Sequence, residues 1–367
     1  MSSEKISAFR TKKNCLLVFR NKKINVFDGA EEVISAFSGL GYYFDKIAYI
    51  AYDRAEEIVN ALKDGRLNYE NLHIYCPYSM DNTLKAFLTA IYSAEFNEKN
   101  ILNSGTDHVF LLYSDKENEL QYSDIKTILD AKYGIKYGKS YVKVYGVTVS
   151  QLNSVIYHAK VKCPEIDFGV SENYGDFRIE ITYPNTVSKV IFDDVMRIIV
   201  TGLNDNIYAM DDISLAERLF QLLKLRKAKI GVAESFTGGG IGKKLVEIPG
   251  ISEVYLEGLN TYSNESKINR LGVKEFTLDR FGAVSEQVAC EMAEGLRKNT
   301  DCDVCIATTG IAGPASDNTL KPVGLIYIAV AVGDNCSVFE YNLSGNREKI
   351  TNTAINLALF HTYKLLK

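Results

Sequence analysis

The chain has 367 residues, of which 46% are hydrophobic and 24% are charged, and its formal net charge is −4. This length predicts two or three domains, and the composition is that of an ordinary globular protein. The slightly acidic balance argues against a dedicated nucleic-acid binder, and no apolar run approaches the roughly 20 residues that span a bilayer.

The first part of the chain, up to residue 139, alternates strand-like and helix-like segments. The predicted strands are short apolar runs at 15–19, 46–49, 72–75 and 109–113. The predicted helices have helical spacing of apolar residues and cover 30–37, 54–62 and 83–92. Strands that alternate with helices predict a mostly parallel sheet with helices on both faces.

The second part, residues 140–208, is shorter and has a different pattern. Its predicted elements are a strand, a helix, a second strand and an amphipathic helix, at 140–147, 149–159, 177–181 and 188–200. We expect a small α+β module, which would be stable when packed on its neighbours.

The third part, residues 209–367, alternates again and predicts another α/β domain. Ser214 and Glu217 form a capping-box pattern in front of the first apolar helix. The predicted strands are at 228–232, 254–260, 303–308, 324–332 and 337–342. The predicted helices are at 238–246, 285–299 and 346–366.

Three polar segments of this third part follow predicted strands, and we interpret them as loops. They contain Ser235 with a glycine run, residues 260–267, and residues 308–314. Ligands of α/β proteins collect at the carboxyl ends of the strands, so the three segments are expected to converge on one crevice.

Ser235 is the candidate nucleophile, and a serine needs a base to become nucleophilic. The only histidine after residue 209 is His361, deep in the predicted final helix, so a Ser-His-Asp triad is not expected. A desolvated lysine can take the role of base, and Lys267 is the leading candidate, with Tyr262 as a hydroxyl partner. Backbone N–H groups of residues 237–240 or of 310–313 could hold an oxyanion.

Each of these residues also has an ordinary structural interpretation. Ser235 alone could be a helix N-cap, Lys267 a solvated surface lysine and Thr309 part of a turn. Cys302 and Cys305 form a single C-x-x-C pattern, which favours buried structural thiols over zinc ligands. It is the joint placement of the polar segments that favours a catalytic site.

The location of the protein is predicted from the N-terminus and the cysteines. Met1 to Lys5 leads into a basic stretch without the apolar core of a secretion signal. The seven scattered cysteines are typical of free thiols in a reducing compartment. We therefore expect a cytoplasmic protein.

Residues 211–367 resemble the C-terminal domain of the CinA family of competence/damage-inducible proteins, which is a nicotinamide-nucleotide amidase. Several ordered segments carry the resemblance. They are 233–239 (AESFTGG), 262–267 (YSNESK), 271–273 (LGV), 282–285 (GAVS), 309–314 (TGIAGP), 321–324 (KPVG) and 345–348 (GNRE). The departures are small, with Phe236 where the family usually has Cys and Asn346 where it usually has Asp.

The resemblance implies hydrolysis of nicotinamide mononucleotide (NMN) to nicotinate mononucleotide and ammonia, without a metal or cofactor. Ser235 would be the nucleophile, Lys267 its base and Tyr262 its hydroxyl partner. The residues expected to contact the substrate are Thr237, Gly238, Gly239, Asn264, Ser285, Thr309, Gly310 and Gly313. The resemblance does not assign a role to Arg347. We expect its guanidinium to pair with the phosphate or the carboxylate of the substrate. A homodimer is implied by the family alone.

The other two parts of the chain resemble full-length members of the family less closely. Residues 140–208 are similar to a small KH-like linker domain but lack a Gly-x-x-Gly clamp, so we expect no nucleic-acid partner. Residues 1–139 resemble a molybdopterin-binding-like three-layer domain that is associated with ADP-ribose pyrophosphatase activity. Its glycine-rich loop is replaced here by residues 75–83 (YCPYSMDNT), so we expect the fold to persist and the pyrophosphatase to be lost.

Two rival interpretations stay open at this point. The chain could be a non-catalytic or regulatory competence/damage-inducible protein whose amidase pocket is a relic. Alternatively, its first domain could retain a nucleotide (ADP-ribose) pyrophosphatase. The intact set of Ser235, Tyr262, Lys267 and Thr309 argues against the first rival, and the missing glycine loop argues against the second.

Overall fold

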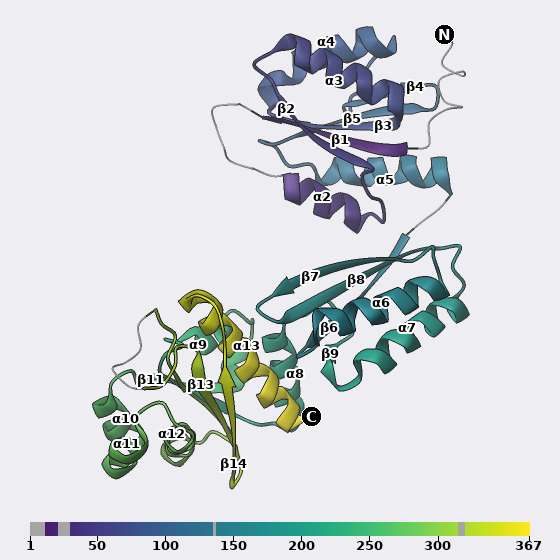
Figure 1. The fold of residues 1–367 in the computed structure, drawn as a ribbon. Helices are drawn as coiled ribbons and strands as arrows, with labels where there is room; N and C mark the ends of the chain where they lie inside the picture. The colour runs from purple at the N-terminus through teal and green to yellow at the C-terminus, as the bar shows by residue number, and fades with distance from the viewer. Residues whose placement is uncertain (1–11, 21–29, 135–136, 315–319) are drawn as a thin grey trace. The chain divides into compact units, whose positions relative to one another are not determined.

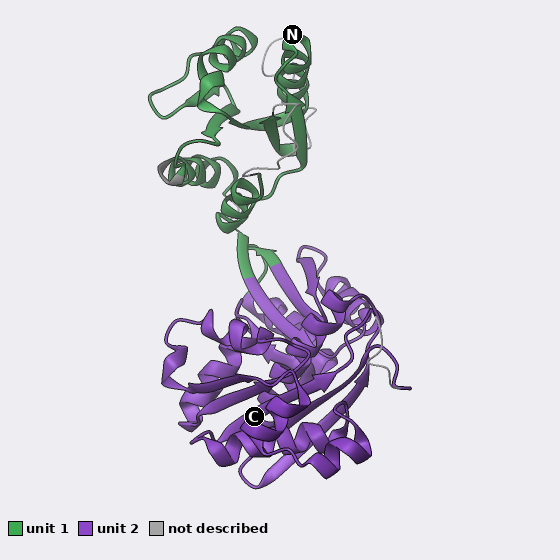
Figure 2. Ribbon diagram, turned by 90° about the vertical axis from the view of Figure 1, so that its left-hand side faces the viewer, with its two compact units in different colours: residues 1–139, 182–188 green, residues 140–181, 189–367 purple. Residues whose placement is uncertain are grey.

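The computed structural model of the chain describes residues 12–20, 30–134, 137–314 and 320–367. The chain forms two compact units, shown in different colours in Figure 2. The first comprises residues 1–139 with 182–188, and the second comprises residues 140–181 with 189–367. The expected division into three domains is finer than this, and it stays a prediction.

The first unit is built on a five-stranded sheet with the strand order β2-β1-β3-β5-β4 (Figure 1). The strands are β1 (Lys12–Arg20), β2 (Lys46–Ala51), β3 (Tyr69–Cys76), β4 (Ile101–Ser104) and β5 (Asp107–Tyr113). The first three and β5 are parallel, whereas β4 pairs antiparallel with β5. The strand β4 is not among the predicted strands because it has only four residues and lies at the sheet edge.

Helices cover both faces of this sheet, as expected from the alternating pattern. Apolar side chains of α2 (Ala30–Gly39) and α5 (Glu119–Tyr133) form one core with the sheet. Side chains of α3 (Ala55–Asn68) and α4 (Asp81–Tyr92) form a second core on the opposite face. The three-layer α/β arrangement expected for this part of the chain is confirmed.

The segment that follows β3 stands where the glycine-rich loop was expected. It turns through a short 3-10 helix (Tyr78–Met80) into α4. Asp81 is only 8% exposed, accepts a hydrogen bond from the hydroxyl of Tyr113 and forms a 3.0 Å ion pair with Lys85. Side chains of the protein itself therefore engage the carboxylate at this position.

Most of a four-stranded sheet of order β7-β8-β6-β9 belongs to the second unit. Its strands are β6 (Tyr137–Tyr145), β7 (Asp167–Asn173), β8 (Asp176–Pro184) and β9 (Ile207–Ala209). Helices α6 (Val149–Lys162) and α7 (Lys189–Leu203) lie side by side on this sheet (Figure 1). The α+β character expected for residues 140–208 is confirmed, whereas the likeness to a KH domain stays a prediction.

This small sheet is joined to the rest of the second unit by specific contacts. The ring of Tyr145 lies 5.0 Å from the ring of Phe360, measured between centroids. Arg178 donates two hydrogen bonds to the carboxylate of Asp212, at 2.7 and 2.8 Å. The amide of Asn356 donates to two carbonyl oxygens of the β7–β8 turn.

The remainder of the second unit has a five-stranded sheet of order β11-β10-β12-β13-β14. Its strands are β10 (Ile230–Glu234), β11 (Tyr255–Asn260), β12 (Val304–Gly310), β13 (Leu325–Val332) and β14 (Asn335–Asn342). The strands β11, β10 and β12 are parallel, and β13 and β14 continue the sheet antiparallel. Parallel strands place their carboxyl ends at one edge, which is where the polar segments lie.

Two groups of helices cover this sheet. On one face are α8 (Leu215–Arg226), α9 (Gly240–Val246) and α13 (Arg347–Leu366). On the other are α10 (Asn264–Leu271), α11 (Glu275–Phe281) and α12 (Glu286–Asn299). None of the helices within the described ranges is both long and apolar enough to cross a membrane.

The expectation that residues 260–267 form a loop is wrong for the second half of this segment, because α10 begins at Asn264. Ser263 is its N-cap and accepts a hydrogen bond from the N–H of Ser266 at 3.1 Å. Gly272 ends the helix with a positive φ of 68°. The helix is polar over its first turn, which is why periodicity did not reveal it.

Candidate active site

The site lies at the carboxyl ends of the three parallel strands β10, β11 and β12 in the second unit. It is a cavity of about 320 Å³. Seven of the predicted site residues line it, namely Ser235, Tyr262, Lys267, Thr309, Gly310, Gly313 and Arg347. The three polar segments of the sequence therefore do converge on one crevice.

Ser235 follows the last residue of β10 and is 8% exposed. The backbone around it is tied to both neighbouring strands. Its N–H donates to the carbonyl of Thr308 at 3.1 Å, and the carbonyl of Glu234 accepts from the N–H of Thr261 at 2.8 Å. This part of the site is thus tied to the sheet, and strands hold a site more precisely than loops do.

Lys267 lies on α10 and is only 1% exposed. Its Nζ lies 3.2 Å from Ser235 Oγ, 2.8 Å from the carbonyl oxygen of Thr261 and 3.1 Å from that of Tyr262. Burial lowers the pKa of Lys267 from 10.5 to about 8, because desolvation penalises the charged ammonium. The interpretation of Lys267 as a solvated surface lysine is wrong.

Tyr262 contacts Lys267 through its carbonyl oxygen. Its side chain is 68% exposed at the cavity. The role expected for its hydroxyl stays a prediction.

Five of the residues expected to contact the substrate lie outside the cavity lining, namely Thr237, Gly238, Gly239, Asn264 and Ser285. Thr237 and Ser285 are buried, and their side chains hydrogen-bond to the segments beside the cavity. The hydroxyl of Thr237 bonds to that of Thr308 at 2.7 Å. Ser285 caps α12 by accepting from the N–H of Val288 at 3.3 Å.

The glycine turn between Ser235 and α9 differs from the expectation in one respect. Gly238 donates its N–H to the carbonyl of Ser235 and Gly240 donates to that of Thr237. The N–H of Gly239 donates to the carboxylate of Glu234. The N–H groups of residues 238–240 are therefore engaged inside the protein, which leaves the N–H of Thr237 as the candidate oxyanion donor of the predicted turn 237–240. The alternative, residues 310–313, stays a prediction.

Thr309 and Arg347 connect the cavity to two further segments. The hydroxyl of Thr309 donates to the carbonyl of Ala283 at 2.8 Å, which fixes the chain in front of α12. Arg347 is the first residue of α13 and is exposed. Its guanidinium donates to the carbonyl of Gly313 at 2.7 Å.

Two kinds of site residue were not predicted from the sequence. Glu234 was quoted only as part of a motif, although an acidic residue next to a glycine run that opens a helix is a recognisable signal. The other kind is apolar, and no signal in the sequence marks it as part of a site. These wall residues are Phe236, Ala283, Val284, Ile311 and Ala312.

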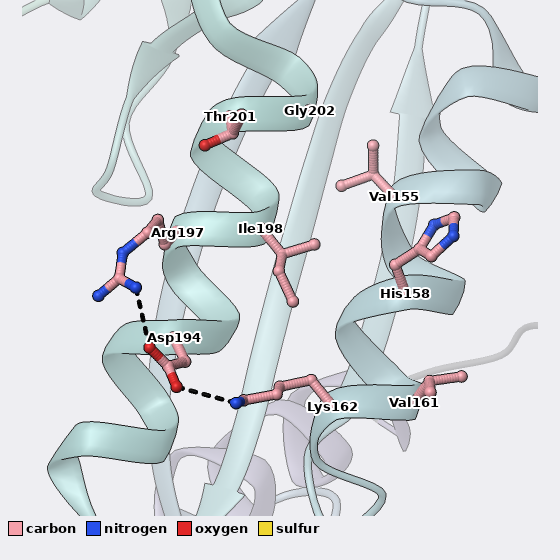
Figure 3. A pocket seen from close by; sticks show the side chains of 9 residues that line it. All are labelled: Val155, His158, Val161, Lys162, Asp194, Arg197, Ile198, Thr201 and Gly202. Carbon is pink, nitrogen blue, oxygen red and sulfur yellow. Dashed lines mark ion pairs between the residues drawn. The ribbon is translucent and has the colours of Figure 1, made fainter.

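A second hollow of the same unit is a groove of about 760 Å³ between α6 and α7 (Figure 3). It is lined mainly by apolar atoms, with Ile198 and Val155 facing it (Figure 3). At one end Asp194 pairs with Lys162 at 2.9 Å and with Arg197 at 3.0 Å. The pairing of Ser235 with Lys267 lies in the smaller cavity, which is therefore the candidate active site.

Comparison with known proteins gives the family of this part of the chain. The family model described as the CinA C-terminal domain matches residues 212–366. A competence-damage inducible protein of Clostridium botulinum (strain Langeland) is 48% identical over 165 residues, which are 45% of this chain and 40% of that protein. One from Acetivibrio thermocellus is 36% identical over 230 residues, which are 62% of this chain and 56% of that protein. The chain thus spans about half the length of these curated relatives, or less.

Among solved structures, the competence/damage inducible protein CihA from Agrobacterium tumefaciens is 36% identical. The match covers 42% of this chain and 94% of that chain, with a TM-score of 0.41 over the comparison. A competence or damage-inducible protein from Enterobacter asburiae is 31% identical and is covered to 96%. The sequence matches and the family model agree, and the chain belongs to the CinA family of competence/damage-inducible proteins through its C-terminal domain.

Proposed function

We propose that the chain is a nicotinamide-nucleotide amidase that hydrolyses NMN to nicotinate mononucleotide and ammonia. The observation that carries the proposal is the buried amine of Lys267, 3.2 Å from the hydroxyl of Ser235 and with a pKa lowered to about 8. A serine with an adjacent base in a cavity is the arrangement of an acyl-transfer enzyme. The family resemblance supplies the identity of the substrate.

The three contacts of Lys267 suit an ammonium, which can donate to all three oxygens, and they also suit a neutral amine. A neutral amine has two N–H bonds and one lone pair. The carbonyls of Thr261 and Tyr262 accept the two N–H groups. The lone pair is then directed to Ser235, whose O–H can donate to it. The same two carbonyls also accept from the ammonium after proton transfer, so the lysine need not move during the reaction.

The reaction follows from this geometry. Ser235 Oγ attacks the carboxamide carbon while its proton passes to Lys267 Nζ. The tetrahedral intermediate collapses, the C–N bond breaks, and the proton on Lys267 leaves with the amine as ammonia. Water then attacks the acyl ester, giving its proton to Lys267, which returns it to Ser235 Oγ as the nicotinate leaves.

The walls of the cavity suit the rest of the substrate. The apolar side chains of Phe236, Val284 and Ile311 offer a surface for the flat pyridine ring. Arg347 is an exposed residue that lines the cavity, and a guanidinium suits the phosphate. The expected homodimer and the cytoplasmic location remain predictions.

The test is ammonia release from NMN without added metal, by the wild type and by Ser235→Ala. We expect the variant to lose activity. A matched control is Ser214→Ala, which removes the N-cap of α8 and leaves the cavity intact. A folded wild type that releases no ammonia would contradict the proposal and favour the regulatory interpretation.

A further inference from the structure

Glu234 is the last residue of β10, directly before Ser235, and is 1% exposed. Its carboxylate accepts three backbone hydrogen bonds from the beginning of α9. The donors are the N–H groups of Gly239 at 3.2 Å, Ile241 at 3.1 Å and Gly242 at 2.9 Å. A buried carboxylate is costly unless its oxygens are satisfied, and these three donors satisfy them.

These three hydrogen bonds decide whether the N–H groups at the start of α9 are available to bind an anion. The first N–H groups of a helix have no partner within the helix and carry partial positive charge. Here a side chain of the protein takes three of them. Neither an anionic group of the substrate nor a developing oxyanion can then use these donors. The N–H groups of Gly239, Ile241 and Gly242 are therefore not the anion site, whereas Arg347 lines the cavity.

The surroundings hold the carboxylate in this position. A Cβ atom added at Gly242 would lie 2.8 Å from Tyr255 Oη and 3.6 Å from Glu234 Oε1. A Cβ atom at Gly258 would lie 2.0 Å from the same hydroxyl. The ring of Tyr255 therefore closes the space beside the carboxylate, and only glycine fits at both positions.

We propose that Glu234 is a positioning residue for the nucleophile, a role that rests on the proposed function. Its backbone is part of β10, and its side chain holds the start of α9. Glu234 therefore contacts both ends of the turn 235–239. Its backbone is bonded to Ser235, and its carboxylate accepts hydrogen bonds from Gly239 and the start of α9. On the other side, the bond between Thr237 and Thr308 holds the turn against β12. Together these contacts keep Ser235 Oγ within reach of Lys267 Nζ.

The variant that tests this role is Glu234→Gln, which keeps the shape and one acceptor oxygen but turns an amide N–H₂ group toward the backbone donors. We expect kcat for NMN to fall about 10- to 100-fold, because small displacements of a reacting group have effects of this size. KM should stay within about threefold, since the walls that bind substrate are unchanged. The pH below which kcat/KM for NMN falls should not change in this variant, because Lys267 is intact.

The matched control is Glu217→Gln. Glu217 also accepts a backbone N–H at the start of a helix, that of Ser214 at 2.6 Å, but it lies outside the cavity lining. This variant should lose a little thermal stability and keep the wild-type kcat. A merely structural role for Glu234 predicts the same behaviour for both variants, with lower stability and no selective loss of kcat.

A second readout is independent of NMN hydrolysis. The labelling rate of Ser235 by a fluorophosphonate should fall in Glu234→Gln by about the same factor as kcat. Equal labelling of folded wild type and variant would overturn the positioning role. If wild-type Ser235 is labelled but NMN is not hydrolysed, the proposed substrate is wrong, and the ratio of labelling rates still decides the role of Glu234. If wild-type Ser235 is not labelled, both proposals are overturned.

Discussion

Lys267 Nζ and Ser235 Oγ lie 3.2 Å apart although 32 positions separate the two residues in the chain. The serine follows β10 and the lysine is on the helix after β11, so the pairing of two parallel strands brings them together. The desolvation that lowers the pKa of Lys267 comes from the same packing.

The stability of the protein should depend on pH through Lys267. The pKa of Lys267 is about 8 in the folded protein and 10.5 ordinarily, which is the value we take for the unfolded chain. Between pH 8 and pH 10.5 the lysine is therefore protonated in the unfolded chain and neutral in the folded protein. The free energy of unfolding therefore rises with pH in this window. Relative to Lys267→Met, the wild type should gain about 3 kcal/mol between pH 8 and pH 10.5. Urea unfolding of both proteins at several pH values measures this, and a constant difference between them would show that the lysine is charged when folded.

Arg347 should act on the phosphate of the substrate. We expect Arg347→Ala to raise KM for NMN about tenfold or more, because a charge-assisted hydrogen bond is lost. The same variant should have little effect on nicotinamide riboside, which has no phosphate. Arg226→Ala is the control, since Arg226 is exposed on α8 and donates to the carbonyl of Lys367. Equal effects on both substrates would show that Arg347 only holds the Gly313 segment.

Gly310 should not tolerate a side chain. A Cβ atom there would lie 2.6 Å from Ile326 Cγ2 and 3.0 Å from Phe236 Cε1. Gly310→Ala should therefore destabilise the protein by about 1–3 kcal/mol and lower kcat/KM, because Phe236 lines the cavity. Gly39→Ala is the control, since a Cβ at that position meets nothing within 4 Å. Thermal unfolding and initial rates test both variants. If Gly310→Ala keeps the stability and kcat/KM of the wild type, the space at Gly310 is not as tight as these distances indicate.

The protein should not hydrolyse ADP-ribose in the presence of a divalent metal. Asp81 is the acidic residue in the segment that replaces the glycine-rich loop, and Tyr113 and Lys85 already engage it. Chromatography of the products with magnesium or manganese tests this. Hydrolysis that disappears in Asp81→Ala would show that the first domain retains a pyrophosphatase.

Much of the fold could be predicted from periodicity, because most strands of both α/β parts are short apolar runs between helical segments. The convergence of Ser235, Lys267 and Thr309 could also be predicted, since residues that follow parallel strands meet at one edge. The edge strand β4 and the polar helix α10 were missed because neither has an apolar period. The apolar walls and the carboxylate of Glu234 depend on tertiary packing, which no local pattern reports.

The most direct test of the paired Ser235 and Lys267 is the pH dependence of kcat/KM for NMN. We propose that Lys267 is the base and acts only when neutral, so we expect an acidic limb with a midpoint near the lowered pKa of about 8 and a tenfold fall per pH unit below it. A rate that stays constant from about pH 6 to pH 9 in the wild type would contradict the account, because Lys267 could not then be the base.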